Sequence, residues 1–422
     1  MKHRNSVRRL ARPLSRILCV LLFVNLIVVT HSSAGAAADE SHFIDPSAIV
    51  QCGAPYNPCS FGSGVYIGPF AILRAGGGAH KTAHKTTPFI TIGNGSNVQD
   101  NTLLDTTTNN RPITLGDGVI IAHGASVYGG AQIGMSGECP PSIFVCASFV
   151  GFNSEVAEDA IVERNAMVTH LARVGPGVRI PSGRVVPPGK NIERNTEVMA
   201  KTVPITDADR EFMDAVIRVN LALAAGYTKL EQQDPTNVCG VNVNPVTDFT
   251  PESVLPTFNN VPMRIPNSPS RIIGAVRLAN VQMPRMGRDV SLRADEGTPF
   301  TVGTVTELKD FATFHALEHT QLRLGNGGTY GIGSLMHGGK FNDKVTSTGN
   351  DFQLGDNSVF YSSTAGTNCR IGAMSFVSDT NLGDNAVVPP RVVVLRGTQS
   401  PVDQWVRRPR PRLSNNHDRC PR

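Results

Sequence analysis

The chain has 422 residues, with 41 Gly, 29 Pro and only 6% aromatic residues, a composition that suits short strands and turns better than a helical bundle. Its length allows two or three domains with a sizeable buried core. The formal charge of +5 lies partly in arginines near the two ends, so the central region is not a basic surface of the kind that binds nucleic acid.

The first 38 residues have the order of a secretory signal peptide. Arginines up to Arg16 precede an apolar stretch, residues 17–29, and small residues follow at 34–38. The apolar stretch is too short to span a membrane comfortably, although an uncleaved anchor is the alternative. We therefore expect an exported protein, periplasmic or extracellular.

Export would place the seven remaining cysteines in an oxidising compartment, where disulfides persist. Cys52 with Cys59, and Cys139 with Cys146, flank short Pro-containing loops and could each form a local bridge. The odd count leaves at least one thiol free or intermolecular, and the lack of a C-x-x-C motif disfavours a cysteine zinc site.

From residue 43 onward an aliphatic residue recurs about every six residues, often followed by Gly, Asn or Asp, as in Val65–Gly68 and Ile90–Gly93. A helix would instead repeat at three and four, so this rhythm predicts the short strands and turns of a parallel β-helix, an all-β solenoid. The first array covers residues 43–191. A helix is predicted from Thr206 to Gly226, capped by Thr206 or Asp207 and packed on the solenoid flank.

The polar, Pro-containing stretch 231–256 is predicted to be a linker. The same rhythm then returns over residues 271–394, inside a second domain that we place at 257–398 and that lacks a terminal helix. The basic stretch 399–422 is predicted to be a disordered solubilising tail, with binding to a polyanion as the alternative.

Five motifs in the two arrays belong together: Ser96–Asp100, Ile121–Gly129, Ser291–Gly297, Phe314–Glu318 and Leu335–Gly339. At these motifs the sequence resembles the γ-class carbonic anhydrases. That family consists of left-handed β-helix trimers in which two metal histidines come from one subunit and the third from its neighbour. The resemblance implies two left-handed parallel β-helix domains, residues 43–230, which end in a helix, and residues 257–398.

Each domain keeps a different part of the family's ligand set. In the first domain His123 matches the histidine donated across the interface, but Asp105 and Tyr128 replace the other two ligands. In the second domain His315 and His337 match those two, and Ile332 replaces the donated histidine. The resemblance therefore implies one composite site, His123 with His315 and His337, shared between the domains.

Three imidazoles suit Zn²⁺, with Fe²⁺ or Co²⁺ possible, and leave a position open for water. The resemblance implies reversible hydration of CO₂ to bicarbonate by a metal-bound hydroxide. Glu296 would assist proton removal and Glu318 would pass protons to solvent, while Gln99, Asn97 and Asn220 would orient hydroxide or bicarbonate. An interface ion pair is expected between Arg293 and Asp100, and a reciprocal pair between Arg74 and Asp310, with Asp295 in the same motif as Arg293.

Two other functions remain open at this stage. The replaced ligands Asp105, Tyr128 and Ile332 are also expected of an inactive γ-carbonic-anhydrase-like scaffold or assembly subunit. Hexapeptide acyltransferases share the solenoid, although no catalytic histidine beside a cofactor groove stands out here. We expect a homo-oligomer, a trimer or a pseudo-hexamer of domains, in which a related subunit could also take part.

Overall fold

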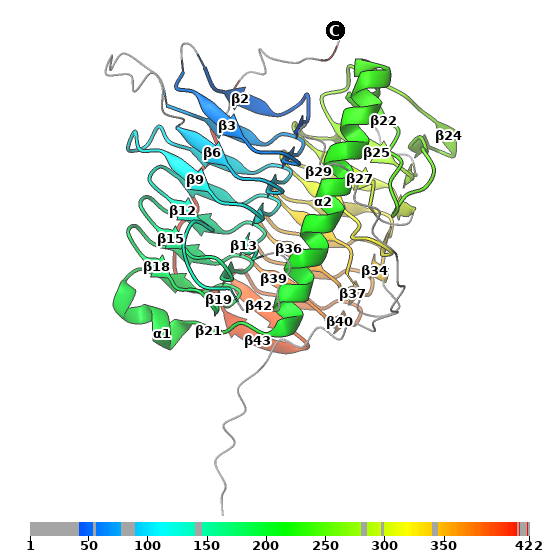
Figure 1. Ribbon diagram of the computed structural model, residues 1–422. Coiled ribbons are helices and arrows are strands. Elements are labelled where there is room, and N and C mark those ends of the chain that lie inside the picture. Colours follow the sequence, from blue (N-terminus) through cyan, green and yellow to red (C-terminus); the bar gives the residue numbers. More distant parts are fainter. Residues whose placement is uncertain are drawn as a thin grey trace, which may run out of the picture.

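The computed structural model describes residues 42–53, 56–76, 89–139, 146–279, 285–296, 299–339, 345–411, 413 and 420. The proposed signal peptide, residues 1–38, lies outside this part of the chain. Two solenoids stand side by side, and one long helix crosses the junction between them (Figure 1).

The first solenoid has three sheets, because every third strand pairs in parallel with the strand one coil further on. One sheet contains β1 (Phe43–Ile44), β4 (Tyr66–Ile67), β7 (Asn97–Val98), β10 (Val119–Ile121), β13 (Ser148–Val150), β16 (Met167–Val168), β19 (Arg184–Val186) and the antiparallel β21 (Val203–Pro204). The second contains β2 (Ile49–Gln51), β5 (Ile72–Arg74), β8 (Leu103–Asp105), β11 (Ser126–Tyr128), β14 (Glu155–Val156), β17 (Arg173–Val174) and β20 (Asn191–Ile192). The third contains β3 (Cys59–Phe61), β6 (Ile90–Ile92), β9 (Ile113–Leu115), β12 (Gln132–Ile133), β15 (Ile161–Val162) and β18 (Arg179–Ile180).

The second solenoid repeats the plan. Its first sheet contains β22 (Val241–Asn242), β25 (Arg271–Gly274), β27 (Ser291–Ala294), β30 (Thr313–His315), β33 (Leu335–His337), β36 (Val359–Tyr361), β39 (Phe376–Ser378), β42 (Val392–Leu395) and the antiparallel β43 (Thr398–Pro401). The second contains β23 (Thr257–Phe258), β24 (Val261–Pro262), β26 (Val276–Leu278), β28 (Phe300–Val302), β31 (Gln321–Leu324), β34 (Val345–Thr348), β37 (Thr364–Ala365) and β40 (Asn381–Leu382). The third contains β29 (Val305–Leu308), β32 (Gly328–Tyr330), β35 (Gln353–Leu354), β38 (Arg370–Ile371) and β41 (Val387–Val388).

The predicted six-residue rhythm is confirmed by the interior of each coil. In the first solenoid the inward positions are aliphatic, for example Ile90 above Ile113 and Leu104 above Val127. The second solenoid buries aromatic rings in the same way, among them Phe314 against Tyr330 and Phe352 against Phe360. Alternation along each short strand then leaves the flanking residues facing outward, where the two solenoids meet.

The long helix α2 (Asp207–Gln233) begins at the predicted cap. Thr206 accepts from the backbone N–H of Asp209, and the Asp209 carboxylate accepts from the backbone N–H of Thr206, which is a complete capping box. The helix runs seven residues beyond the predicted end at Gly226. Gly226 is therefore inside the helix and not at its cap, and Tyr227 and Leu230 continue the buried stripe. A side chain at position 226 would meet Pro245 at 2.8 Å, so the glycine allows this close approach.

Helix α2 packs on both solenoids at once. Met213 and Ile217 join an apolar cluster with Phe149 of the first solenoid and with Leu335 and Val359 of the second. Higher on the helix, Leu223 and Tyr227 join Phe43, Tyr66 and Ile273 in a second cluster. The short helical segments are η1 (Asn195–Glu197), α1 (Val198–Lys201) and η2 (Pro235–Val238).

The predicted linker, 231–256, is only partly a linker. Its first residues complete α2, residues 235–238 form η2, and β22 already pairs with β25, so the second solenoid begins near Val241. The backbone groups of β22 are hydrogen-bonded because this strand pairs with β25. The polar, Pro-containing composition of the stretch does not indicate this pairing.

The described part of the predicted disordered tail is packed on the protein, contrary to the prediction. Strand β43 pairs with β42, and Val402 and Trp405 are buried. We call residues 402–411 with Leu413 the C-terminal strap. The strap crosses the first solenoid, and Cys420 beyond it forms a disulfide with Cys239. The burial of Val402 and Trp405 and the disulfide hold this segment on the protein despite its high content of arginine.

Both predicted local disulfides are present, Cys52–Cys59 and Cys139–Cys146, and Cys369 is a free, buried thiol. With Cys239–Cys420 there are three bridges, which indicates an oxidising compartment. None of the helices in the described ranges combines the length and apolar character needed to cross a membrane.

Candidate metal centre

Two of the three candidate ligands stand in one column of the second solenoid. Strands β27, β30 and β33 stack in register, so that Arg293, His315 and His337 lie one above another. Phe314 and Met336 point into the coil, and alternation therefore turns both histidines outward, toward the first solenoid. They are nevertheless buried, with exposed fractions of 2% and 4%.

The third candidate ligand comes from a corner of the first solenoid. His123 follows β10 and precedes Gly124, whose φ of +75° turns the chain. His123 is buried, and its Nε2 lies 3.1 Å from Nδ1 of His315. One ring nitrogen from each of His123, His315 and His337 lies within 4.8 Å of the others. The structure thus brings together the three histidines that the sequence divides between two domains.

The other nitrogen of each ring faces an oxygen atom. His123 Nδ1 lies 3.5 Å from Asp100 Oδ1, and His337 Nδ1 lies 2.8 Å from the Gly338 carbonyl oxygen. His315 Nε2 lies 3.1 Å from Glu296 Oε1 and 3.4 Å from Asp295 Oδ1. Metal-binding histidines commonly donate their second N–H to a carboxylate or a carbonyl, which leaves the inner nitrogen free to bind.

This arrangement fits a divalent metal. Zinc–nitrogen bonds of about 2.0–2.1 Å in tetrahedral geometry put two ligand nitrogens roughly 3.3 Å apart, close to the 3.1 Å between His123 and His315. Three imidazoles also leave a fourth position for a water or a substrate. The triad can therefore hold zinc, or another ion that imidazole suits.

The three rings differ in their protonation. Burial lowers the pKa of His123 and of His337, which favours the neutral form that binds metals. Burial acts in the same direction on His315, but the carboxylates of Glu296 and Asp295 outweigh it and raise its pKa to about 9. A cation at the triad would compete with that proton.

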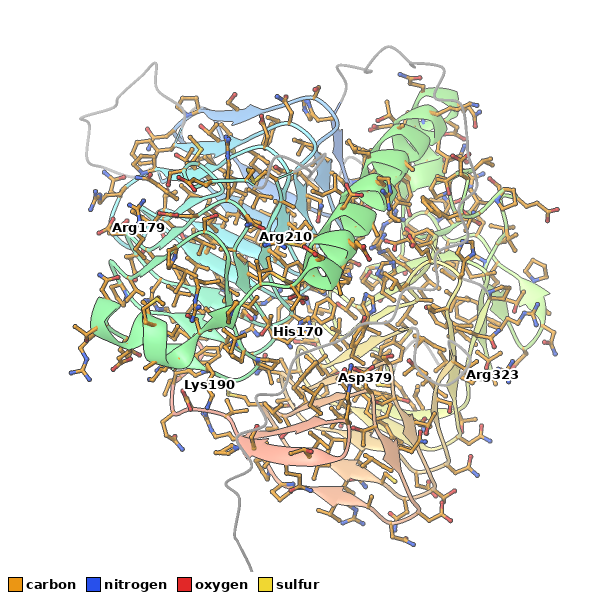
Figure 2. The ribbon with its side chains drawn as sticks, turned by 60° about the horizontal axis from the view of Figure 1, so that its bottom comes forward. His170, Arg179, Lys190, Arg210, Arg323 and Asp379 are labelled. Carbon is orange, nitrogen blue, oxygen red and sulfur yellow. A yellow bond between two sulfur atoms is a disulfide. The ribbon has the colours of Figure 1, made fainter. Side chains whose placement is uncertain are left out.

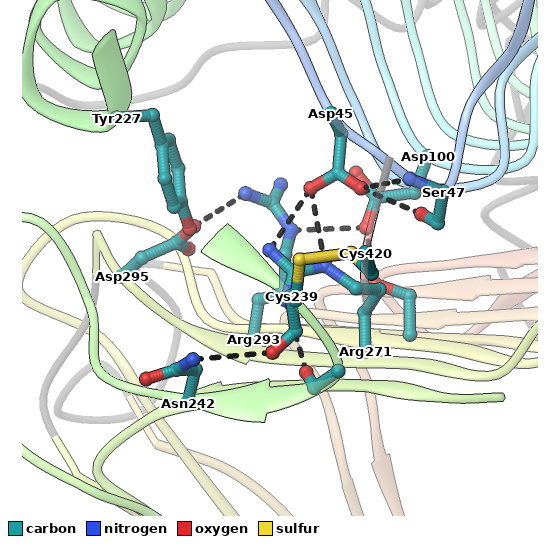
Figure 3. A network of polar contacts seen from close by, with 12 residues as sticks. Asp45, Ser47, Asp100, Tyr227, Cys239, Asn242, Arg271, Arg293, Asp295 and Cys420 are labelled. Carbon is teal, nitrogen blue, oxygen red and sulfur yellow. Dashed lines mark hydrogen bonds and ion pairs between the residues drawn. A yellow bond between two sulfur atoms is a disulfide. The ribbon is translucent and has the colours of Figure 1, made fainter. Parts of the chain in front are cut away.

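Behind the triad lies a buried charge network that joins both solenoids and α2 (Figure 3). Arg293 Nε donates to Asp100 Oδ2 over 2.9 Å, and its Nη1 donates to Asp295 Oδ2 over 2.5 Å and to the Tyr66 hydroxyl over 3.0 Å. The hydroxyl of Tyr227 on α2 also donates to Asp295. Burial acts to raise the pKa of Asp100 and of Asp295, but Arg293 outweighs it and holds both well below the usual range.

A second ion pair crosses the junction nearby. Arg271 donates to Asp45 Oδ2 from both Nε and Nη2, over 3.1 and 3.0 Å (Figure 3). The solenoid corners add backbone-directed bonds. Nδ2 of Asn101 donates to the carbonyl oxygens of Asp289 and Phe311, and Nδ2 of Asn153 donates to those of Gly333 and Asn357. Together these contacts fix where His123 stands relative to the second solenoid.

The residues predicted to orient the substrate are placed as follows. Asn97 and Gln99 are buried, and no hydrogen-bond partner is found for either side-chain atom of Asn97 within the described ranges. Asn220 donates to the Val216 carbonyl of its own helix, and its Oδ1 is buried without such a partner. Glu318 is half-buried, three residues beyond His315.

The predicted reciprocal ion pair is not formed. Arg74 Nη1 instead meets Asp105 Oδ2 at 2.9 Å, because β5 and β8 pair in register and place the two side chains side by side. Asp310 accepts from the backbone N–H of Arg288. Asp105 thus gives Arg74 a partner inside its own solenoid.

Several contributors escaped sequence reasoning. Tyr227 lies just beyond the predicted end of the helix, and nothing in the sequence shows that its hydroxyl reaches Asp295. Tyr66, whose hydroxyl accepts from Arg293, lies outside the five motifs, and the motif that begins at Ser291 does not show that the Ser291 hydroxyl donates to Asp100. The Gly338 carbonyl is a backbone group and leaves no mark in the sequence.

No protein-family model matches the chain. Over 210 residues, 45% of the chain, it is 28% identical to a "Carbonic anhydrase" of Methanosarcina thermophila and covers 73% of that protein. It is 27% identical over 212 residues to "Carboxysome assembly protein CcmM" of Nostoc sp., and 31% identical over 105 residues to "Gamma carbonic anhydrase 2, mitochondrial" of Arabidopsis thaliana. The chain spans about a third of the length of each of these two, 32% in both cases.

Among solved structures, a hexapeptide transferase family protein of Anaplasma phagocytophilum aligns with 44% of this chain and 91% of its own, at 19% identity and a TM-score of 0.30. A UDP-N-acetylglucosamine acyltransferase of Arabidopsis aligns with 83% of this chain and 70% of its own, at 12% identity and a TM-score of 0.13.

Proposed function

Because the chain belongs to the γ-carbonic anhydrase family of hexapeptide-repeat left-handed β-helix proteins, we propose that it hydrates CO₂ reversibly to bicarbonate at the triad His123, His315 and His337. The observation that supports this proposal is the convergence of one ring nitrogen from each histidine, with each outer nitrogen facing a carboxylate or a carbonyl. A divalent metal held there would bring the pKa of a bound water to about 7 and so supply a nucleophile for CO₂ near neutral pH.

The chain's own residues would hold the triad and move the proton. Asp100 and Glu296 set the orientation of the His123 and His315 rings, and Arg293 holds Asp100 in place. The carboxylate of Glu296 would accept a proton released during turnover, and half-buried Glu318 would pass it toward solvent. Asn97, whose two buried polar side-chain atoms lack partners among the described residues, would hold bicarbonate by hydrogen bonds together with Gln99 and Asn220.

The proposed setting is outside the cytoplasm. The three disulfides and the signal-like residues 1–38 support export to a periplasmic or extracellular space. Assembly into a homo-oligomer is part of the same proposal, because the exposed Ile332 of the second solenoid stands where a further family interface would lie. Mass photometry of the purified chain would measure that assembly.

The direct test is CO₂ hydration by stopped flow on protein loaded with zinc, or with iron under anaerobic conditions, with metal content measured on the same sample. We expect about one metal per chain and hydration that is lost in His337→Ala. The matched control is Tyr128→Ala, which changes the equivalent position of the first solenoid and should leave hydration intact.

A second function is favoured by the replacements in the first solenoid. Its ligand column holds Asp105 and Tyr128, and Asp105 is already paired with Arg74. A chain that had retained the interface alone would serve as a scaffold. Stoichiometric metal without measurable hydration would favour that function, and absence of metal from carefully loaded protein would contradict both the composite site and the activity.

A further inference from the structure

The C-terminal strap brings two arginines to the junction of the solenoids, immediately behind His123. Arg407 donates from its two terminal nitrogens to the carbonyl oxygens of Asn153 and Gly124. Arg410 lies over the ring of Phe311, 5.6 Å from its centroid. A Cβ built on Gly124 would meet Nη2 of Arg410 at 3.6 Å, so both guanidinium groups converge on one solenoid corner.

Among the described residues, Glu155 is the carboxylate that acts on Arg407, and Asp289 is the one that acts on Arg410. Arg408, between the two arginines in the chain, pairs with Glu158 and approaches Glu155, but no ion pair reaches Arg407 or Arg410 within the residues that the structure describes. Nη1 of Arg410 is buried and has no hydrogen-bond partner in the described part of the chain. Burial lowers the pKa of Arg407 to about 10 and that of Arg410 to about 9, and for Arg410 the neighbouring Arg407 adds to the effect. Two enclosed like charges destabilise a fold unless an anion compensates them.

A cavity of about 210 Å³ opens beside the two groups. The strap residues Arg407 and Arg410 line one side, and the corners Phe311, Gly333 and Asn357 of the second solenoid line the other. This space is large enough for a small ion and several waters. The lining offers guanidinium N–H groups, which suit the planar or tetrahedral oxygens of an oxyanion.

We propose that Arg407 and Arg410 form a binding site for a small oxyanion, bicarbonate or phosphate, between the C-terminal strap and the two solenoids. The site is separate from the histidine triad and does not depend on a metal. Its occupant would neutralise the two guanidinium groups and so fasten the strap over the junction. Bicarbonate would arise as the product of the proposed reaction, whereas phosphate would come from the surrounding medium.

The test is calorimetric titration of the full, disulfide-bonded chain after metal removal with a chelator, using sodium phosphate and sodium bicarbonate separately at constant ionic strength. Metal removal ensures that an anion bound at the triad does not contribute. We expect saturable binding and a rise in Tm with anion concentration. Tighter binding of bicarbonate would assign the product as the occupant, and tighter binding of phosphate would assign the medium ion.

Arg410→Gln should weaken binding by about tenfold, as expected for the loss of a hydrogen bond between charged groups. Arg410→Lys keeps the charge without the fork and should bind with intermediate affinity, which covers the case in which the glutamine variant fails to fold. Arg323→Gln is the control, since Arg323 is exposed on β31 of the second solenoid (Figure 2) and does not line the cavity. No saturable binding of either anion by the unmodified chain, or equal binding by Arg410→Gln, would overturn the proposal.

Discussion

The two solenoids contain the same column of three outward positions and use it differently. In the first solenoid the column is Arg74, Asp105 and Tyr128, and in the second it is Arg293, His315 and His337, with the same register between neighbouring strands. The first column is closed by its own ion pair and by the strap, where Arg408 lies 4.1 Å from the centroid of the Tyr128 ring. The second is covered by His123 of the other solenoid. The two columns have the same backbone arrangement. The residues that cover each column, the strap in the first and His123 in the second, determine whether it can hold a metal.

The largest difference between the two columns is expected when the matched residues His337 and Tyr128 are each replaced by alanine. His337→Ala should abolish tight metal binding, because two imidazoles remain where three are needed, while Tyr128→Ala should leave the metal content unchanged. Elemental analysis of the purified variants measures both. Retained metal in His337→Ala would show that the three histidines do not act as one site.

The next largest effect is expected in stability, at the arginines that head the two columns. Arg293→Met leaves Asp100 and Asp295 buried without their partner and should lower the free energy of unfolding by about 3–5 kcal/mol. Arg74→Met removes a partly exposed pair and should cost no more than about 1 kcal/mol. Denaturant unfolding of both variants compares them directly, and equal losses would mean that the network behind the triad contributes no more than a surface pair.

The strap that covers the first column can be tested through its disulfide. The Cys239–Cys420 bridge spans 181 residues of sequence and Cys52–Cys59 only 7. Replacing both cysteines of the long bridge by serine should cost about 2–5 kcal/mol, and more than the same change in the short bridge, because a longer loop loses more entropy when it is closed. Thermal unfolding of the two double variants measures the difference. Metal content should stay constant in both, and its loss in the long-bridge variant would indicate that the strap also supports the triad.

The smallest expected effect concerns His170, which lies at the junction of the solenoids (Figure 2), with its ring near Phe152 and Phe376. Burial lowers its pKa to about 3, so between about pH 6.5 and 3 the unfolded chain takes up a proton that the folded chain does not. Stability conferred by neutral His170 is therefore present above pH 6.5 and is lost as the pH falls. Between pH 7 and 5 the free energy of unfolding should fall by about 2 kcal/mol more in the unmodified chain than in His170→Gln. An identical pH dependence in the two proteins would contradict this prediction.

Much of the fold could be predicted from the sequence, because a solenoid is set by local, repeated signals. The six-residue rhythm reports which residues point inward, and the capping box marks the start of α2 at Thr206. The end of α2 could not be predicted, because Gly226 looks like a helix end in the sequence. In the folded chain it allows the close approach of Pro245, a tertiary contact that the local sequence does not indicate. The strap was missed for a related reason. Its arginines suggest a solvated tail, whereas Trp405, Val402 and Cys420 fix it to the protein.

The residues of the candidate site that belong to motifs could be predicted from the sequence. The contacts that depend on strand register, backbone groups or the path of α2 could not. His123, His315 and His337 could be identified from their motifs, and the pair Arg293 with Asp100 from the same resemblance. Arg74 was assigned the wrong partner because motif matching kept the ancestral pairing, while the register of β5 and β8 places Asp105 beside it. The oxygen beside His337 Nδ1 is the Gly338 backbone carbonyl, which no side chain marks. The Tyr227 hydroxyl reaches Asp295 only because of the path of α2 over the solenoids, which the sequence does not reveal.

The placement of all three histidines on one chain has a consequence for how the site responds to concentration. A centre assembled from separate subunits falls apart on dilution, because its third ligand leaves with the neighbouring molecule. Here the second solenoid cannot diffuse away from the first, and α2 and the Cys239–Cys420 bridge keep the effective concentration of His123 around the other two histidines high and constant. A metal held at this triad would then stay bound at high dilution without a second molecule.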